Sequence, residues 1–337
     1  MKQFLTIFVI GMMIPYITTL AWTGRVEDFG VGTGSELSGE ANTEFSDVDE
    51  AAVSGAAMNG TEKQVVVIRN GRETGISVEA FLPHVLAAQI PADFEMETLK
   101  AQAVLARTYI YREIEAAGLG NFIYEEALDM DAWSKEQMEE KWGSKAWADR
   151  YGRLERAAAE TAGMVLSFGG EYVEPLFCYA SSGTTRSHGE EFPYLRQAVS
   201  PGDLLAENYL SVSEFTASEM AGLINEIPGG VDISAAQIPG EIQIVERDAA
   251  GYVRQIQVGK KTYTGEEIQY ALGLPSSCYS FEQSKDKIRT VCKGVGHGYG
   301  FAQFGANEMA KEGKNFQELL GYYFQNVEIV SKEAADR

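Results

Sequence analysis

The chain has 337 residues, and its 28 Lys and Arg against 49 Asp and Glu give a formal charge of −21. A charge this negative argues against a nucleic-acid-binding protein, because binding to phosphates requires clustered Lys and Arg. Three cysteines are too few for a disulfide-stapled miniprotein or for a zinc module with four thiolates. We therefore expect a packed protein of one large domain or two modest ones.

The chain begins with an apolar segment, residues 1–25. After Lys2, the run from Phe4 to Trp22 contains no charged side chain, and Arg25 closes it. A helix over the 19 residues of this run would be ~28 Å long, close to the ~30 Å hydrocarbon core of a bilayer. We predict an N-terminal membrane anchor, with a cleaved signal peptide as the alternative. Either segment places the remainder of the chain outside the cytoplasm.

Residues 26–63 have the composition of a flexible linker. They are rich in Gly, Ser, Ala and Thr, and they carry nine acidic residues against one Lys. Such a segment cannot bury enough apolar surface to offset the entropy of ordering itself. We predict an acidic tether that lets a globular body, residues 64–337, sample a volume near its membrane.

The body starts with a strand and two helices. Val65–Arg69 is rich in β-branched residues, and Asn70-Gly71 is a tight-turn signal. Ser77 can cap a helix over residues 78–89, and a second helix is predicted from about Asp93 to Ala117. Apolar residues repeat at helical spacing in the second helix and should face the core: Leu99, Ala103, Ala106 and Ile110.

The rest of the body mixes helices with hairpins. Residues 134–161 indicate further helices, and at least one final helix is predicted within 307–324. Between these regions, alternating patterns and turn residues predict hairpins over 164–179, 241–262 and 278–292. Strands and helices do not alternate regularly, so we predict an α+β fold of mixed helices and antiparallel hairpins in one large extracytoplasmic body.

Two segments of the body carry polar groups in a pattern that could serve chemistry. Ala88–Pro91 together with Leu99–Tyr109 forms a helix-turn-helix unit, in which Lys100 and Arg107 lie on the surface or in ion pairs. Tyr179–Thr185 is a cluster of hydroxyls after a predicted strand. It is either a loop that satisfies its own backbone or a row of hydrogen-bonding groups beside a polyhydroxyl ligand.

A third segment, Gly294–Ala306, is rich in glycine. Its five glycines surround His297 and Gln303, and they permit positive φ angles or a close approach of backbone to a ligand. A nucleotide loop is excluded, because the dinucleotide motif needs a parallel strand before it and the Walker Lys-Ser/Thr pair is absent. His297 is therefore either a structural residue or a ligand-binding one.

These segments together resemble the SpoIID/LytB family, and the resemblance implies a lytic transglycosylase of peptidoglycan. The resemblance rests on the anchor, the tether and several runs of residues: Leu99–Tyr109, Ser181–Thr185, Phe192–Leu195, Ser200-Pro201 and Gly296–Ala310. It implies action during engulfment of the forespore, on glycan strands whose stem peptides have been removed. A carboxylic acid would protonate the oxygen between N-acetylmuramic acid and N-acetylglucosamine, and its conjugate base would help the muramyl 6-hydroxyl close a 1,6-anhydro ring.

The resemblance also implies a location and partners. The protein would sit in the mother-cell membrane as a single-pass protein, with its body facing the intermembrane space. It would cooperate with the engulfment amidase, stage II sporulation protein P, and with a polytopic membrane protein of the same stage, and it would need no cofactor. The residues expected to contact the glycan are Ser181, Ser182, Gly183, Thr185, His297 and Gln303.

The sequence departs from this family at the catalytic acid. The family glutamate lies in a Glu-Met-Pro segment, and this chain has Gln89-Ile90-Pro91 at that place. Glutamine can hydrogen-bond a glycosidic oxygen but has no proton to transfer to it. Either another acid substitutes, with Glu95 or Glu97 nearest, or the protein is a catalytically silent glycan-binding or scaffolding member of the engulfment complex. Three carboxylates nearer the hydroxyl cluster are also open to either a catalytic or a solvated role: Glu190, Glu191 and Asp203.

Some relatives carry zinc, bound by a His and two Cys around the Ser-Gly loop. Here the matching places hold Cys178 and Thr184, with His188 in a different register, which falls short of a tetrahedral site, so we predict no metal. Cys278 and Cys292 have another possible use. They are symmetric about a predicted turn at Ser284-Lys285-Asp286, so they should lie opposite one another and form a disulfide outside the cytoplasm.

Overall fold

A computed structural model of the protein describes residues 62–69 and 71–332. The predicted anchor and all but the end of the predicted linker lie outside the described residues. Within the described ranges, no helix is both long enough and apolar enough to cross a membrane. Where the sequence predicted one body, the described residues form two compact units. Unit 1 comprises residues 62–175, 313–321 and 326–332, and unit 2 comprises residues 176–312 and 322–325.

Unit 1 begins with the predicted strand and helix. Strand β1 (Gln64–Arg69) pairs antiparallel with β2 (Arg72–Ser77) and parallel with β3 (Phe122–Tyr124). Helix α2 (Val78–Gln89) has Ser77 as its N-cap, where the Ser77 hydroxyl accepts a hydrogen bond from the Ala80 N–H at 3.3 Å. Because this bond satisfies one of the free N–H groups of the first turn, the helix starts where the sequence predicted.

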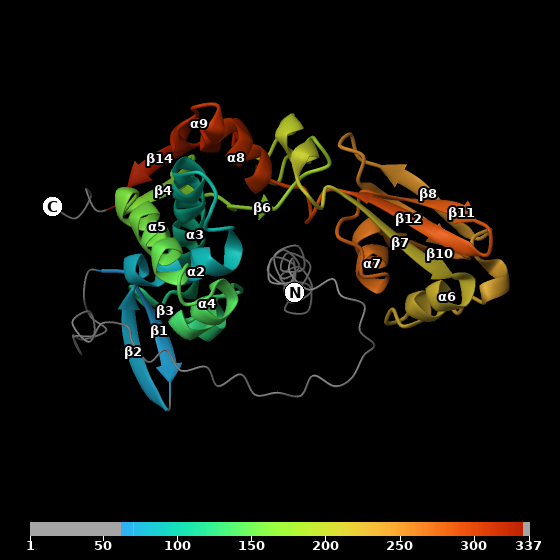
Figure 1. Ribbon diagram of the computed structural model, residues 1–337, viewed down its shortest axis with the longest axis horizontal. Coiled ribbons are helices and arrows are strands. Elements are labelled where there is room, and N and C mark those ends of the chain that lie inside the picture. Colours follow the sequence, from blue (N-terminus) through green and yellow to red (C-terminus); the bar gives the residue numbers. More distant parts are fainter. Residues whose placement is uncertain (1–61, 70, 333–337) are drawn as a thin grey trace. The chain divides into compact units, whose positions relative to one another are not determined.

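Helix α3 (Met96–Ala117) is the buried centre of unit 1. It begins after a turn in which the Phe94 N–H bonds to the Pro91 carbonyl, so it starts later than the predicted Asp93. Figure 1 shows α3 beside α2 and α5 (Trp147–Glu160). The four apolar residues predicted to face the core are all buried: Leu99, Ala103, Ala106 and Ile110.

Arg107 of α3 is a fully buried cation. Its Nε and Nη2 donate to the two carboxylate oxygens of Glu79 at 2.7 and 2.6 Å, and Nη2 also donates to the Ala158 carbonyl at 3.1 Å. Nη1 donates to the Met164 carbonyl at 3.1 Å. Of the two sequence interpretations, the ion pair is therefore correct and the surface position is wrong. A cation without solvent needs this many acceptors, and they tie α3 to α2, α5 and the following strand.

The rest of unit 1 forms a small sheet and further helices. Strand β4 (Met164–Phe168) turns back into β5 (Glu171–Tyr172), which confirms the first part of the predicted hairpin, and β14 (Glu328–Ser331) pairs antiparallel with the other side of β4. The remaining elements of unit 1 are η1 (Glu125–Ala127), α4 (Lys135–Trp142) and the greater part of α9 (Phe316–Tyr323), which ends in unit 2.

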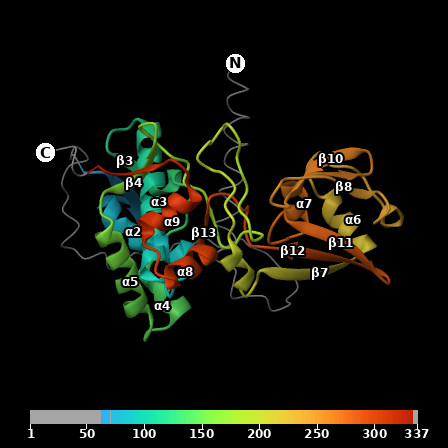
Figure 2. The ribbon, with the colours of Figure 1, turned by 90° about the horizontal axis from the view of Figure 1, so that it is seen from above.

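Unit 2 contains two three-stranded antiparallel sheets and a short parallel pair. One sheet has the order β10-β9-β8, the second has the order β11-β12-β7, and β6 pairs parallel with β13. Figure 2 shows the two larger sheets with α6 and α7. The bounds are β6 (Phe177–Cys178), η2 (Pro201–Leu205), β7 (Leu210–Thr216), α6 (Ala217–Asn225), η3 (Ala235–Gln237), β8 (Ile242–Arg247), β9 (Val253–Val258), β10 (Lys261–Thr264), α7 (Gly265–Ala271), β11 (Tyr279–Ser284), β12 (Lys287–Lys293), β13 (Phe301–Ala302) and α8 (Gln303–Lys311).

The core of unit 2 joins both larger sheets to both helices. Met220 and Ile224 of α6, Ile268 of α7, Ile256 of β9 and Ile288 of β12 all belong to one buried apolar cluster. The inward-facing residues of β12 alternate with exposed ones, as expected for a sheet with one face on the core. The prediction of an α+β fold with antiparallel hairpins is confirmed.

The hairpin that carries two of the cysteines has a different register from the predicted one. Tyr279 lies opposite Cys292, and the turn consists of Lys285 and Asp286 alone, with Lys285 at a φ of 56°. The prediction that Cys278 lies opposite Cys292 was therefore wrong, because a two-residue turn shifts every pair by one position. Both cysteines are buried free thiols in this structure.

Candidate functional site

Gln89, which the resemblance predicts to stand at the place of the family acid, lies at the C-terminal end of α2 and is only 1% exposed. Its Oε1 accepts a hydrogen bond from Nε2 of Gln102 on α3 at 2.9 Å. Helix α2 ends here because the next residue but one is Pro91, which disfavours helical backbone before it. The position therefore presents a buried, uncharged amide held by a second amide.

The two glutamates named as substitutes are in different surroundings. Glu95 is the exposed N-cap residue of α3, and its side chain makes no capping hydrogen bond. Glu97 forms an ion pair with Lys100 at 2.7 Å and accepts a hydrogen bond from the Phe316 N–H at 2.9 Å. These contacts give Glu97 a structural role, whereas Glu95 remains on the surface.

The hydroxyl cluster of unit 2 is built around a buried carboxylate, Asp203. Its Oδ2 accepts hydrogen bonds from the Ser181 N–H at 2.9 Å and the Ser181 hydroxyl at 2.5 Å, and its Oδ1 accepts one from the Gly305 N–H at 2.7 Å. Asp203 is 0% exposed, and burial raises its pKa to about 6, against the lowering effect of these hydrogen bonds. The carboxylate therefore fixes Ser181 to the first turn of α8.

Other members of the cluster also bond within the protein. The Ser182 hydroxyl donates to the Ala250 carbonyl at 2.8 Å, and the buried Thr185 hydroxyl accepts from the Ala198 N–H at 2.9 Å. Ser182 and Gly183 remain partly exposed, and the Leu204 side chain lies next to Gly183. The loop thus hydrogen-bonds its own polar groups and leaves Ser182 and Gly183 partly exposed.

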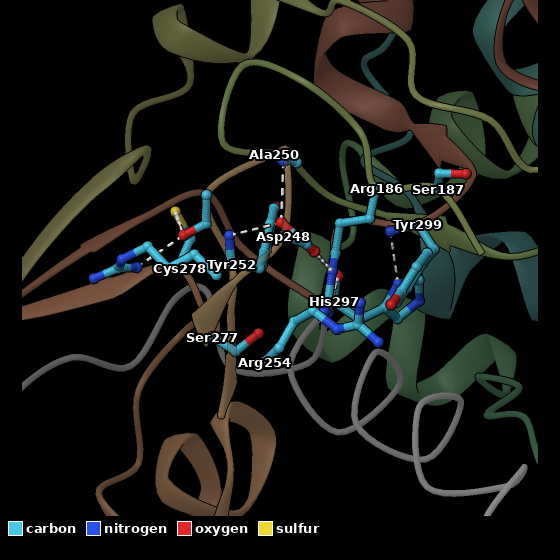
Figure 3. A network of polar contacts seen from close by, with 12 residues as sticks. Arg186, Ser187, Asp248, Ala250, Tyr252, Arg254, Ser277, Cys278, His297 and Tyr299 are labelled. Carbon is cyan, nitrogen blue, oxygen red and sulfur yellow. Dashed lines mark hydrogen bonds and ion pairs between the residues drawn. The ribbon is translucent and has the colours of Figure 1, made fainter. Parts of the chain in front are cut away.

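His297, in the glycine-rich segment, is buried and neutral. Its Nδ1 accepts a hydrogen bond from the Tyr299 N–H at 3.0 Å, and its other contact is the backbone of Phe177. Burial, followed by the charge of Arg186, lowers the pKa of His297 to about 3. Figure 3 shows His297 close to Arg186 and Tyr299. An uncharged imidazole with both nitrogens engaged holds the loop in place.

Arg186 links the hydroxyl loop to the rest of unit 2. Its Nε lies 2.6 Å from Asp248, and its Nη1 lies 2.7 Å from Glu266. The guanidinium also stacks between Tyr252 and Tyr299, with its Cζ 4.8 and 4.4 Å from the two ring centroids. Figure 3 shows Arg186 beside Asp248 and Tyr252, which both belong to the turn between β8 and β9. The two carboxylates and two rings offset the cost of burying the cation.

Two glycines of the segment are required by close packing. At Gly298, with φ at 80°, a Cβ would lie 2.3 Å from the Tyr252 ring, and at Gly300, with φ at 69°, it would lie 2.0 Å from the Leu176 carbonyl oxygen. The segment ends in α8, where Gln303 is fully buried. The glycines thus serve positive φ and close approach within the protein.

The structure brings some predicted site residues together. Ser181, Ser182, Gly183, Thr185, His297 and Gln303 all belong to unit 2, and Gln89, Glu95 and Glu97 all belong to unit 1. Contact of the first group with a glycan stays a prediction. The sequence interpretation missed Arg186 and Tyr252 and treated Asp203 only as a possible acid. The one signal for Arg186 in the sequence was its place directly after the hydroxyl cluster. Its acidic partners, Asp248 and Glu266, lie 62 and 80 residues away along the chain.

No group of three or more His, Cys, Asp or Glu side chains in the described ranges is arranged to hold a metal ion. Cys178 is fully buried, and burial raises its pKa well above the ordinary value. His188 lies between the rings of Phe192 and Tyr299, at centroid distances of 4.6 and 5.1 Å. Each residue is thus explained by its packing.

The SpoIID family model, described as stage II sporulation protein, matches residues 72–168. Over 263 residues, the chain is 30% identical to stage II sporulation protein D of Bacillus amyloliquefaciens, which covers 75% of this chain and 74% of the relative. This chain belongs to the SpoIID family. Its similarity to stage II sporulation protein D of Bacillus subtilis (strain 168) covers 99% of this chain and 97% of the relative, at 28% identity.

A more distant relative in the comparison is the amidase enhancer of Bacillus subtilis (strain 168), which is 22% identical over 74% of this chain and 40% of its own length. The SpoIID match at residues 72–168 includes Gln89, Glu95 and Glu97 and ends before the hydroxyl cluster. The chain is therefore a SpoIID protein whose matched region carries a buried glutamine, Gln89.

Proposed function

We propose that this protein binds peptide-stripped glycan strands of peptidoglycan during sporulation and does not cleave them. Membership of the SpoIID family supports the sporulation role, and the family resemblance supports the glycan as ligand. The observation that carries the absence of cleavage is Gln89, a neutral amide that is buried and hydrogen-bonded to Gln102. General acid catalysis contributes typically 10²–10⁴-fold to such a reaction, and an amide cannot supply it.

The side chain of Gln89 has the fixed orientation that a binding site needs. The Gln102 amide holds the Gln89 side chain in one orientation, so its polar group would be preorganised for a hydrogen bond to sugar. A glutamate at this position could accept the same bond from Gln102, and burial would raise the pKa of its carboxyl group toward that of a general acid. The substitution therefore removes proton transfer and preserves the surrounding geometry.

The second candidate function is a lytic transglycosylase that cleaves the bond between N-acetylmuramic acid and N-acetylglucosamine and leaves a 1,6-anhydro end. The observation that favours it is the position of Glu95, an exposed carboxylate at the start of α3 and close in sequence to Gln89. Glu97 is the poorer substitute, because its carboxylate is already bonded to Lys100 and to the Phe316 N–H.

We also propose that the protein works from a membrane, with its two units outside the cytoplasm and with an amidase as partner. The apolar run from Phe4 to Trp22 supports the anchor. The resemblance supports stage II sporulation protein P and a polytopic membrane protein as partners. The name of one relative, amidase enhancer, adds support for cooperation with an amidase.

The test uses the full-length chain in neutral detergent with denuded glycan strands. Co-sedimentation measures binding, and mass spectrometry of the soluble products detects 1,6-anhydromuramyl ends. We expect the natural chain to bind the strands and to release no such product, and we expect Gln89→Glu to release it. The gain should be in the range of 10²–10⁴-fold over background.

Two further variants separate the candidates. If the natural chain releases 1,6-anhydro products and Glu95→Gln abolishes them, the second candidate is correct. Glu97→Gln is the matched control, because it removes a carboxylate two positions away that is engaged within the protein. If neither the natural chain nor Gln89→Glu sediments with the strands or releases 1,6-anhydro products, both candidates are wrong.

A further inference from the structure

Strand β7 is an outer strand of the β11-β12-β7 sheet of unit 2. Figure 2 shows β7 at the border of this sheet. Its seven residues pair only with β12 within the described part of the chain. An outer strand presents a row of backbone donors and acceptors that another strand can use.

The register identifies which backbone groups face outward. The Gly294 N–H bonds to the Tyr209 carbonyl, and the Tyr209–Gly294 positions continue the β7–β12 register. Hydrogen-bonded pairs recur at every second residue of an antiparallel pair, so the N–H and C=O groups of Ser211, Ser213 and Phe215 point at β12. Those of Leu210, Val212 and Glu214 point away from the sheet, and no described residue bonds to their N–H groups.

A groove lies at the C-terminal end of this strand, where β7 leads into α6. It has a volume of about 460 Å³, and its lining comes from β7 and α6: Glu214, Phe215, Glu219, Gly222, Leu223 and Glu226. Phe215 and Leu223 pack against the buried core of unit 2 and form the apolar part of the lining. An extended segment on the edge of β7 would therefore reach this groove where it passes Glu214 and Phe215.

The lining is negatively charged. It includes three glutamates and no Lys or Arg. Glu214 has a cation nearby, with Lys287 at 3.2 Å and both side chains exposed. The Glu219 carboxylate caps α6 through Thr216, and Glu226 forms no ion pair with a described residue. The complement of this groove is an extended segment that carries Lys or Arg.

We propose that an extended, basic segment of a partner protein adds to the edge of β7 as a fourth strand. Its main chain pairs with the outward groups of Leu210, Val212 and Glu214. Alternate Lys or Arg side chains lie along Phe215 and Leu223 and place their charges by Glu219 and Glu226. The intervening side chains are apolar and extend the exposed face of Leu210 and Val212, which are 57% and 45% exposed.

Other occupants and other edges fit less well. The acidic segment of this chain, residues 26–63, would bring nine carboxylates to an acidic groove. A second copy of β7 carries no Lys or Arg and would bring no cation to the groove. At the other edge of the sheet, the Arg247 guanidinium already donates to the Tyr279 carbonyl of β11 at 2.8 Å.

The test measures binding of a fluorescent, end-blocked peptide, Thr-Lys-Val-Lys-Val-Lys-Thr, to the full-length chain in neutral detergent by fluorescence anisotropy. We expect binding that weakens about tenfold in Val212→Pro, because proline removes one outward N–H and leaves the bonds to β12 in place. Val212→Ala is the matched control and should bind within about twofold of the natural chain. We expect Glu226→Gln to weaken binding as well.

A second peptide tests the main-chain contacts directly. The same sequence with N-methyl groups on alternate amides keeps its charge and loses strand pairing, so we expect it not to bind. Circular dichroism checks that each variant keeps its fold. If Val212→Pro and the N-methylated peptide bind as well as their parents, the interaction is charge attraction alone and the proposal is wrong. A dimer that Val212→Pro dissociates in sedimentation would assign β7 to a second copy and would equally overturn it.

Discussion

Asp203 is a carboxylate that unit 2 buries completely. Its two oxygens accept from Ser181 and Gly305, and Ser200 is also within hydrogen-bonding reach. Burial outweighs these bonds, and the pKa of Asp203 rises from 3.8 to about 6. The folded protein therefore holds a proton on this carboxyl more tightly than the unfolded chain does. Below about pH 4 the contribution of Asp203 is most favourable, and it declines as the pH rises to about 6.

This behaviour predicts a pH-dependent effect of Asp203→Asn. The free energy of unfolding of the natural protein minus that of the variant should fall by up to ~3 kcal/mol between pH 4 and pH 7, because the variant cannot ionise there. Urea unfolding followed by circular dichroism at several pH values measures this difference. Asp232→Asn, at an exposed carboxylate, is the control. A difference that does not change with pH would contradict the prediction.

At the scale of elements, the parallel pair of β6 and β13 depends on a glycine, Gly300, which has no side chain. The Phe301 N–H bonds to the Leu176 carbonyl at 2.9 Å, and Gly300 lies directly against the same carbonyl. Residues 177–178 and 301–302 form the whole of this pair, so one intruding methyl group can separate the strands. The pair also positions His297 and α8 on either side of β13.

We predict that Gly300→Ala destabilises the protein by ~3 kcal/mol or more, since it combines a positive φ with a contact at 2.0 Å. Gly313→Ala is the matched control. Gly313 also has a positive φ, but a Cβ there has no atom within 4 Å, so the expected cost is only ~1–2 kcal/mol of backbone strain. The midpoints of thermal unfolding compare the two variants, and equal shifts would show that the close contact is unimportant.

At the scale of the whole molecule, unit 1 is completed by residues that follow unit 2 in the chain. Strand β14 covers one side of β4, where Val165 and Leu166 are fully buried. We predict that removal of residues 326–337 speeds hydrogen–deuterium exchange in residues 164–168 and leaves residues 287–293 of unit 2 unchanged. Removal of residues 333–337 alone keeps β14 and should change neither segment. Faster exchange in both units would contradict the prediction.

The sequence predicted local features well and distant pairings poorly. Ser77 as a helix cap, the buried face of α3 and the hairpin of β11 and β12 follow from neighbouring residues. The register of that hairpin depended on one turn residue, Lys285, and was missed. The buried Arg186 could not be assigned, because nothing local distinguishes an Arg that meets Asp248 and Glu266 from a solvated one. Likewise, the burial of Asp203 could not be predicted, because Gly305, which donates to its carboxylate, lies 102 residues away in the chain.

The pairing of β4 with β14 also bears on how the chain is made. Met164 lies opposite Ser331, so the ribosome synthesises all of unit 2 after β4 and before β14, the strand that pairs with β4. Domains generally fold as their residues emerge. Unit 2 can therefore begin to fold during translation. The β14-β4-β5 sheet of unit 1 can be completed only after β14 has been synthesised. Synthesis of β14 is therefore the step that completes the fold of unit 1.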